Sequence, residues 1–149
     1  MEPLNFPPYQ FRLRLNSEKR EEIFDPCRKK WLFLTPEEWV RQNWLQHLVN
    51  AFKIPLSMIT VEGGFKVVQR QKRFDVLVYK NTSPALLLEC KSTSAPINQE
   101  VLDQILVYNR KYKSKFLVLS NGIQHKYFKV DYTNGKLTEL LELPPYEDW

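Results

Sequence analysis

The stretch that decides the fold is Arg73–Lys91, which reads RFDVLVYKNTSPALLLECK. Its two apolar runs, 74–79 and 85–90, flank a break that is rich in turn-forming residues. Two such runs on either side of a short polar break predict a β-hairpin. Because strand side chains alternate between faces, the second run should turn its even-numbered residues, Cys90 among them, toward a core.

Three charged residues interrupt this hairpin. Asp75 lies early in the first run, whereas Glu89 and Lys91 lie at the end of the second run, two residues apart and therefore on one face of the strand. Two carboxylates and an ammonium near one sheet edge indicate a magnesium site with a group that handles water. The alternative interpretation is a pair of solvated strand ends, which commonly carry charges.

The composition is that of a folded domain. The chain has 149 residues, of which 43% are hydrophobic and 13% are aromatic, enough for one compact domain over residues 1–149. No apolar run reaches the length of a membrane span and the N-terminus lacks a signal-peptide pattern, so we expect a cytoplasmic protein with no membrane partner. Cys27 and Cys90 lack metal-ligand spacing, and we expect two free thiols.

The chain is basic, with a net charge of +5, which favours a polyanionic partner. One basic cluster, Arg70, Lys72 and Arg73, directly precedes and opens the hairpin and can follow a phosphate backbone. A solvated exposed turn explains the same cluster equally well.

A helix is expected before the hairpin. Thr35 can cap it, Pro36 suits its first position and Glu38 completes a capping box, so the helix should run from Pro36 to about Phe52. The acidic first turn, Glu37 and Glu38, complements the helix dipole. The alternative role of Glu38, or of Glu37, is an extra contact to a metal ion or to water.

Short elements complete the first half of the chain. Residues 11–15 alternate between apolar and basic and suggest a short edge strand, whereas residues 18–22 are polar and suggest a turn or a short helix. Residues 58–61 and 65–69 look extended, on either side of two glycines.

A helix and a strand are expected after the hairpin. Residues 97–112 have the apolar period of a helix, and residues 115–120 form an apolar strand. A strand, a helix and a strand imply a crossover, so the sheet should be at least partly parallel. Gln104 and Tyr108 are four residues apart and share a helix face that can point at the end of the hairpin. A surface role for Gln104 and a core role for Tyr108 are the plainer alternative.

A second hairpin is expected near the end of the chain, because Asn134-Gly135 is a strong signal for a tight turn between strands.

The order of these motifs resembles the PD-(D/E)xK nuclease superfamily, and within it the N-terminal nuclease domain of the R (HsdR) subunits of type I restriction enzymes. The resemblance covers about residues 28–130 and implies an α/β fold with a restriction-endonuclease-like αβββαβ core, in which helices flank a mixed central sheet. It rests on four segments in the family's order: TPEEWVRQ (35–42), RFDVLVY (73–79), LECK (88–91) and QILVY (104–108).

The sequence also departs from the family. Phe74 precedes Asp75 where the superfamily's motif has proline, a change that this family tolerates. The 149 residues include no helicase motor, so we expect a stand-alone relative rather than a complete R subunit.

The resemblance implies Mg²⁺-dependent hydrolysis of DNA phosphodiester bonds, with Mn²⁺ able to substitute for Mg²⁺. Asp75, Glu89 and the backbone carbonyl of Cys90 would hold the ion, together with several waters. Glu38 would be the accessory helix carboxylate. No other cofactor is implied.

The remaining roles also follow from the resemblance. Lys91 would position or deprotonate the attacking water, Gln104 would contact DNA or the network around the lysine, and Tyr108 would support Gln104. The basic side chains of Arg70, Lys72 and Arg73 would contact backbone phosphates.

DNA is the implied partner, and a homodimer or a larger restriction or repair complex stays open. The alternative function is a non-catalytic module on the same fold that binds nucleic acid or joins a complex.

Overall fold

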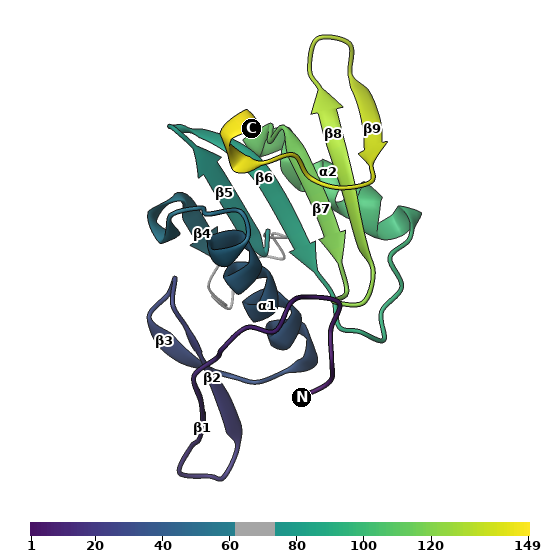
Figure 1. Cartoon of the computed structure of the whole chain (residues 1–149). Coiled ribbons are helices and arrows are strands. Elements are labelled where there is room, and N and C mark those ends of the chain that lie inside the picture. Colours follow the sequence, from purple (N-terminus) through teal and green to yellow (C-terminus); the bar gives the residue numbers. More distant parts are fainter. Residues whose placement is uncertain (62–73) are drawn as a thin grey trace.

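The computed structural model describes residues 1–61 and 74–149, and its centre is a six-stranded sheet (Figure 1). In spatial order the strands are β4 (Ile59–Val61), β5 (Val76–Lys80), β6 (Ser83–Cys90), β7 (Phe116–Ser120), β8 (His125–Asp131) and β9 (Lys136–Leu140). Two helices, α1 (Pro36–Asn50) and α2 (Gln99–Tyr112), cover opposite faces of this sheet. The extended segment expected at residues 65–69 lies outside the described residues.

The predicted hairpin is confirmed as β5 and β6, which pair antiparallel with Val76 opposite Leu88. The turn passes through Asn81, whose φ of 57° lies in the left-handed region that asparagine tolerates. The second predicted hairpin is also confirmed, because β8 and β9 pair antiparallel around a turn that contains Gly135.

The predicted crossover is confirmed as well. Strand β6 pairs with β7 in parallel, and α2 connects them, whereas the neighbouring strand pairs are antiparallel. The sheet is therefore mixed, and the order α1, β4, β5, β6, α2, β7 is the αβββαβ arrangement that the sequence predicted.

Both helices begin at a side-chain cap. Thr35 accepts a hydrogen bond from the backbone N–H of Glu38 (3.1 Å), and Pro36 occupies the first turn of α1 as predicted. Asn98 caps α2 by accepting from the N–H of Val101 (3.2 Å). Capping by Asn98 explains why α2 begins two residues later than its apolar pattern alone suggested.

The alternation of β6 divides the core into two clusters. Leu86, Leu88 and Cys90 pack on the side of α1, as predicted, and are fully buried. Leu87 faces the other way and packs in the cluster that contains Ile105 of α2. Neither Cys90 nor Cys27 forms a disulfide, so the prediction of free thiols is confirmed.

A small antiparallel sheet precedes α1. It consists of β1 (Leu13–Leu15), β2 (Glu21–Asp25) and β3 (Lys30–Phe33), with β2 in the middle. The expected short edge strand is β1. The turn or short helix expected at residues 18–22 is wrong for its last two residues, which begin β2. These residues extend because β2 pairs with a strand on each side and buries Ile23 and Asp25.

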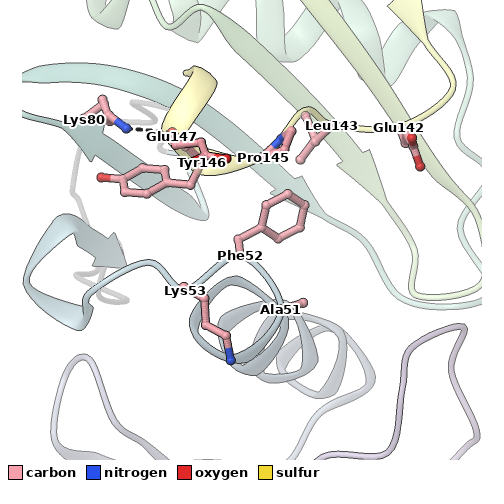
Figure 2. A pocket seen from close by; sticks show the side chains of 9 residues that line it. All are labelled: Ala51, Phe52, Lys53, Lys80, Glu142, Leu143, Pro145, Tyr146 and Glu147. Carbon is pink, nitrogen blue, oxygen red and sulfur yellow. Dashed lines mark hydrogen bonds between the residues drawn. The ribbon is translucent and has the colours of Figure 1, made fainter.

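The last residues form a C-terminal strap, residues 141–149, which includes the short helix η2 (Tyr146–Asp148). The Tyr146 hydroxyl donates to the carbonyl of Tyr79 and the Lys80 ammonium donates to the carbonyl of Tyr146, both at 2.7 Å. Figure 2 shows the pocket of about 630 Å³ between this strap and the end of α1, with Lys53, Lys80 and Glu147 among its lining residues.

The first residues form an N-terminal strap, residues 1–9, which crosses α1 (Figure 1). Two histidines hold it: His125 Nε2 donates to the carbonyl of Asn5 (2.9 Å), and the hydroxyl of Tyr9 is 2.7 Å from His47 Nδ1. The ring of Phe6 packs against both imidazoles. No helix within the described parts of the chain is long and apolar enough to span a membrane.

The two histidines should make the stability of the domain sensitive to acid. Burial lowers the pKa of His125 and of His47 below the ordinary value of 6.5. The unfolded chain therefore takes up these protons at a higher pH than the folded chain, so stability falls as the pH drops below about 6.5. Melting temperatures measured from pH 7.5 to pH 5 will show this loss.

The matched control is His125→Gln, whose amide can still donate to Asn5 but does not titrate. We expect its melting temperature to fall less over the same range. An equal fall in both proteins would contradict the assignment to His125.

Candidate active site

The three charged residues of the hairpin lie at one end of β5 and β6. Asp75 immediately precedes β5, and its Oδ2 accepts a hydrogen bond from the backbone N–H of Cys90, the last residue of β6 (2.6 Å). Glu89 Oε1 lies 3.3 Å from Lys91 Nζ, so these two side chains share a face as the alternation predicted. The fold therefore brings two carboxylates and one ammonium together.

Glu89 is the most perturbed of these groups. Its side chain is 9% exposed, and Oε2 has no hydrogen-bond partner among the described residues. Burial, followed by the charge of Asp75, raises the pKa of Glu89 to about 8, although Lys91 opposes this shift. A buried oxygen without a partner is costly unless a cation or a proton reaches it.

Arg41 of α1 connects the hairpin to the first turn of its helix. Its Nη2 donates to Asp75 Oδ1 (2.6 Å) and its Nη1 donates to Glu38 Oε1 (2.7 Å). Burial alone would lower the pKa of Arg41, but the charges of Asp75 and Glu38 raise it overall. The guanidinium is therefore a fixed positive charge beside Asp75.

Glu38 lies within a buried network. Besides Arg41, its oxygens accept from Gln42 Nε2 (3.1 Å) and from Arg28 Nη2 (3.3 Å). Arg28 and Gln42 also bond Asp25, at 2.8 and 3.0 Å. The suggested role of Glu38 as an accessory metal ligand stays a prediction, and in this arrangement both of its oxygens already have partners.

Glu37 is more exposed than the other carboxylates near the site, with 50% of its side chain accessible to solvent. Burial and then the charge of Asp75 raise its pKa, whereas Arg41 and Lys91 lower it. The carboxylate of Glu37 therefore interacts electrostatically with both Asp75 and Lys91.

The helix residues singled out by the sequence lie on α2. Burial, followed by the charges of Glu89 and Asp75, raises the pKa of Tyr108 to about 12. Gln104 lies one turn earlier and is half-buried. The DNA contacts predicted for Gln104 stay predictions.

The other nucleic-acid residues predicted from the sequence, Arg70, Lys72 and Arg73, lie outside the described residues. Sequence reasoning missed Arg41. Its only local signal is its spacing, three residues after Glu38 and four after Glu37, which is the spacing of helical ion pairs. That spacing does not reveal the contact with Asp75.

The donor set of the site fits a hard divalent cation. Asp75 and Glu89 supply carboxylate oxygens, the ligands that Mg²⁺ prefers, and Glu89 Oε2 is a buried acceptor without a partner in the described part of the chain. Mg²⁺ commonly uses one or two carboxylates and completes its shell with water. Within residues 1–61 and 74–149, however, no group of three or more His, Cys, Asp or Glu side chains is arranged to hold a metal ion.

The pocket of Figure 2 is separate from this site. It contains Lys80, at the opposite end of β5 from Asp75. Five residues of extended strand separate these ends by roughly 16 Å.

Together these elements define a mixed α/β fold in which an αβββαβ core carries two carboxylates and a lysine at one end of its central hairpin. The family described as Type I restriction enzyme R protein N terminus (HSDR_N) matches residues 36–144. The chain belongs to this family. The matched region begins with α1 and ends in the C-terminal strap, so it includes Arg41, Asp75, Glu89 and Lys91, whereas Asp25 and Arg28 precede it.

Comparison with solved structures gave a fragment assigned as an HsdR subunit of a type I restriction enzyme from Vibrio vulnificus YJ016. It is 27% identical to this chain, with a TM-score of 0.40, and the match covers 60% of this chain but 17% of that chain. A comparison with curated proteins gave no match.

The raised pKa of Glu89 predicts a stability that depends on pH in chelator. Because the folded chain keeps this proton up to about pH 8, whereas an unfolded Glu loses it near pH 4.5, stability should fall as the pH rises through this window. Glu89→Gln keeps a neutral side chain throughout. At pH 8.5 we expect the variant to be more stable than the parent by on the order of 1–3 kcal/mol, and by less at pH 5.5.

Urea unfolding at both pH values, in chelator, measures this difference. A variant that is less stable than the parent at both values would show that Glu89 is ionised and stabilising in the metal-free chain.

Proposed function

We propose that this chain is a metal-dependent DNA phosphodiesterase of the PD-(D/E)xK type. The observation that carries the proposal is the convergence of Asp75, Glu89 and Lys91, with a buried Glu89 oxygen that has no partner among the described residues. Membership of the R-protein family supports a DNA substrate. The net charge of +5 agrees with a polyanionic partner.

In the proposed mechanism, Asp75 and Glu89 would hold the ion through Oδ1 and Oε2, while the N–H of Cys90 fixes Asp75 through its other oxygen. When bound, Mg²⁺ or Mn²⁺ would supply positive charge to stabilise the phosphorane-like transition state and the leaving oxygen. Lys91 orients the attacking water with its ammonium and offsets charge on the phosphate. Tyr108 and Gln104 line the α2 side, where they support the lysine or contact the DNA.

The wider setting is also a proposal. The family name refers to type I restriction enzymes, so we propose a cytoplasmic role within a DNA-acting restriction complex. The alternative function is a non-catalytic module that binds DNA on the same fold. The activity experiment below distinguishes this alternative from the proposed nuclease.

Metal binding should depend on Asp75. We expect Mn²⁺ to raise the melting temperature of the parent, since a ligand that binds only the folded state at 100 times its Kd stabilises it by about 2.7 kcal/mol. Asp75→Asn removes the charge but keeps an acceptor for the N–H of Cys90, and it should lose most of this gain. An equal gain in melting temperature in the parent and in Asp75→Asn would contradict metal binding by Asp75. The charged residues would then be a structural ion cluster.

Cleavage should depend on Lys91. We expect the purified parent to nick or linearise supercoiled plasmid with Mg²⁺ or Mn²⁺ and to lose this activity in chelator. Lys91→Ala should lower the rate by about 100-fold or more, because a positioned group that stabilises charge in the transition state contributes roughly that much.

The matched control is Lys136→Ala, which removes the same charge at the exposed start of β9. It should retain activity. Equal activity in the parent and in Lys91→Ala would indicate a contaminant or a misplaced site. Metal binding without cleavage in the parent would favour the non-catalytic module.

A further inference from the structure

The guanidinium of Arg41 occupies the side of Asp75 that a metal ion would need. Asp75 Oδ2 accepts a hydrogen bond from the N–H of Cys90, and the other oxygen, Oδ1, lies 2.6 Å from Arg41 Nη2. Both side chains are largely buried, with 13% and 12% exposure. The ion pair is therefore poorly screened by solvent, and each partner needs the other.

The surrounding charges are unbalanced. Five carboxylates lie in the connected cluster of the described residues, on Asp25, Glu37, Glu38, Asp75 and Glu89, whereas three basic side chains pair with them, on Arg28, Arg41 and Lys91. The acidic groups therefore outnumber the basic groups, so the cluster can take up a proton or a cation.

Two buried atoms of the same cluster lack partners among the described residues: the acceptor Glu89 Oε2 and the donor Arg41 Nε. The guanidinium uses its two terminal nitrogens for carboxylates and leaves Nε unbonded. The protein groups of the described residues thus leave one buried acceptor and one buried donor of this cluster without a protein partner.

We propose that Arg41 is the resident counter-ion of the metal-free site, which holds Asp75 in place and competes with a divalent cation for Asp75 Oδ1. This inference rests on the proposed metal site and concerns how that site is regulated. Arg41 stabilises the fold when no cation is bound. It weakens cation binding, because the cation must either displace the guanidinium from Asp75 or bind beside its positive charge.

The cluster also contains a place for the displaced guanidinium. Glu37 Oε1 lies 3.6 Å from Arg41 Nη2, longer than a good hydrogen bond, and its side chain is half exposed. Arg41 can keep its bond to Glu38 and shorten its contact with Glu37 when Asp75 Oδ1 accepts a metal ion. A monovalent cation offers less charge for this exchange, so the arrangement favours divalent ions.

The test compares Mn²⁺ affinity of metal-depleted full-length proteins by electron paramagnetic resonance, together with melting temperatures in chelator and in Mn²⁺. We expect Arg41→Met to melt several degrees lower than the parent in chelator, to bind Mn²⁺ at least about 10-fold more tightly, and to gain more stability from it. Asp75→Asn should bind weakly in the same titration.

Arg28→Met is the matched control. It also removes a largely buried arginine bonded to Glu38, but Arg28 pairs with Asp25 in the same network. We expect it to lose stability in chelator without a comparable gain in Mn²⁺ affinity. If Arg41→Met does not fold, Arg41→Lys provides the comparison. It keeps the positive charge but loses the planar guanidinium that bonds two carboxylates at once. Its Mn²⁺ affinity should be higher than that of the parent.

The outcomes separate this inference from the proposed function. If the parent binds Mn²⁺ through Asp75 and the Arg41 variants bind it equally or more weakly, Arg41 is a support for the ligand and the counter-ion proposal fails alone. If neither the parent nor any Arg41 variant binds Mn²⁺, both proposals fail. If the Arg41 variants bind and the parent binds only weakly, the counter-ion proposal is supported.

Discussion

The burial of β6 on both faces is the constraint on which the rest of the structure depends. This strand lies between β5 and β7 and is covered by α1 on one side and α2 on the other. Leu86, Leu87 and Leu88 have no exposed surface, so an ionised side chain among them would carry a large desolvation cost. Charged groups can lie only where the strand ends, and Glu89 and Lys91 are there.

The same burial determines which elements can complete the site. A carboxylate at the end of β6 needs positive charge or hydrogen-bond donors from segments that reach that end, and the first turns of α1 and the body of α2 do so. The acidic first turn of α1 consequently has two structural uses. Its backbone is capped by Thr35, and its carboxylates fix Arg41 against Asp75.

The sequence predicted those parts of the fold that depend on neighbours along the chain. The β5–β6 hairpin, the start of α1 and the shared face of Glu89 and Lys91 follow from alternation and capping, which act over a few residues. The start of β2 was missed because its extended form depends on pairing with strands on both sides. Arg41 was missed because Asp75 lies 34 residues away in the chain.

The ion pair between α1 and the hairpin also has a consequence for the order of folding. Asp75 and the N–H of Cys90 are 15 residues apart, whereas Asp75 and Arg41 are 34 apart. Proteins rich in local contacts fold faster, so we expect the hairpin to bring the two carboxylates together before Arg41 of α1 reaches them. During that interval Lys91 and dissolved cations would oppose the repulsion between the two carboxylates. Divalent cations should therefore increase the refolding rate, an effect that is separate from their effect on the final stability.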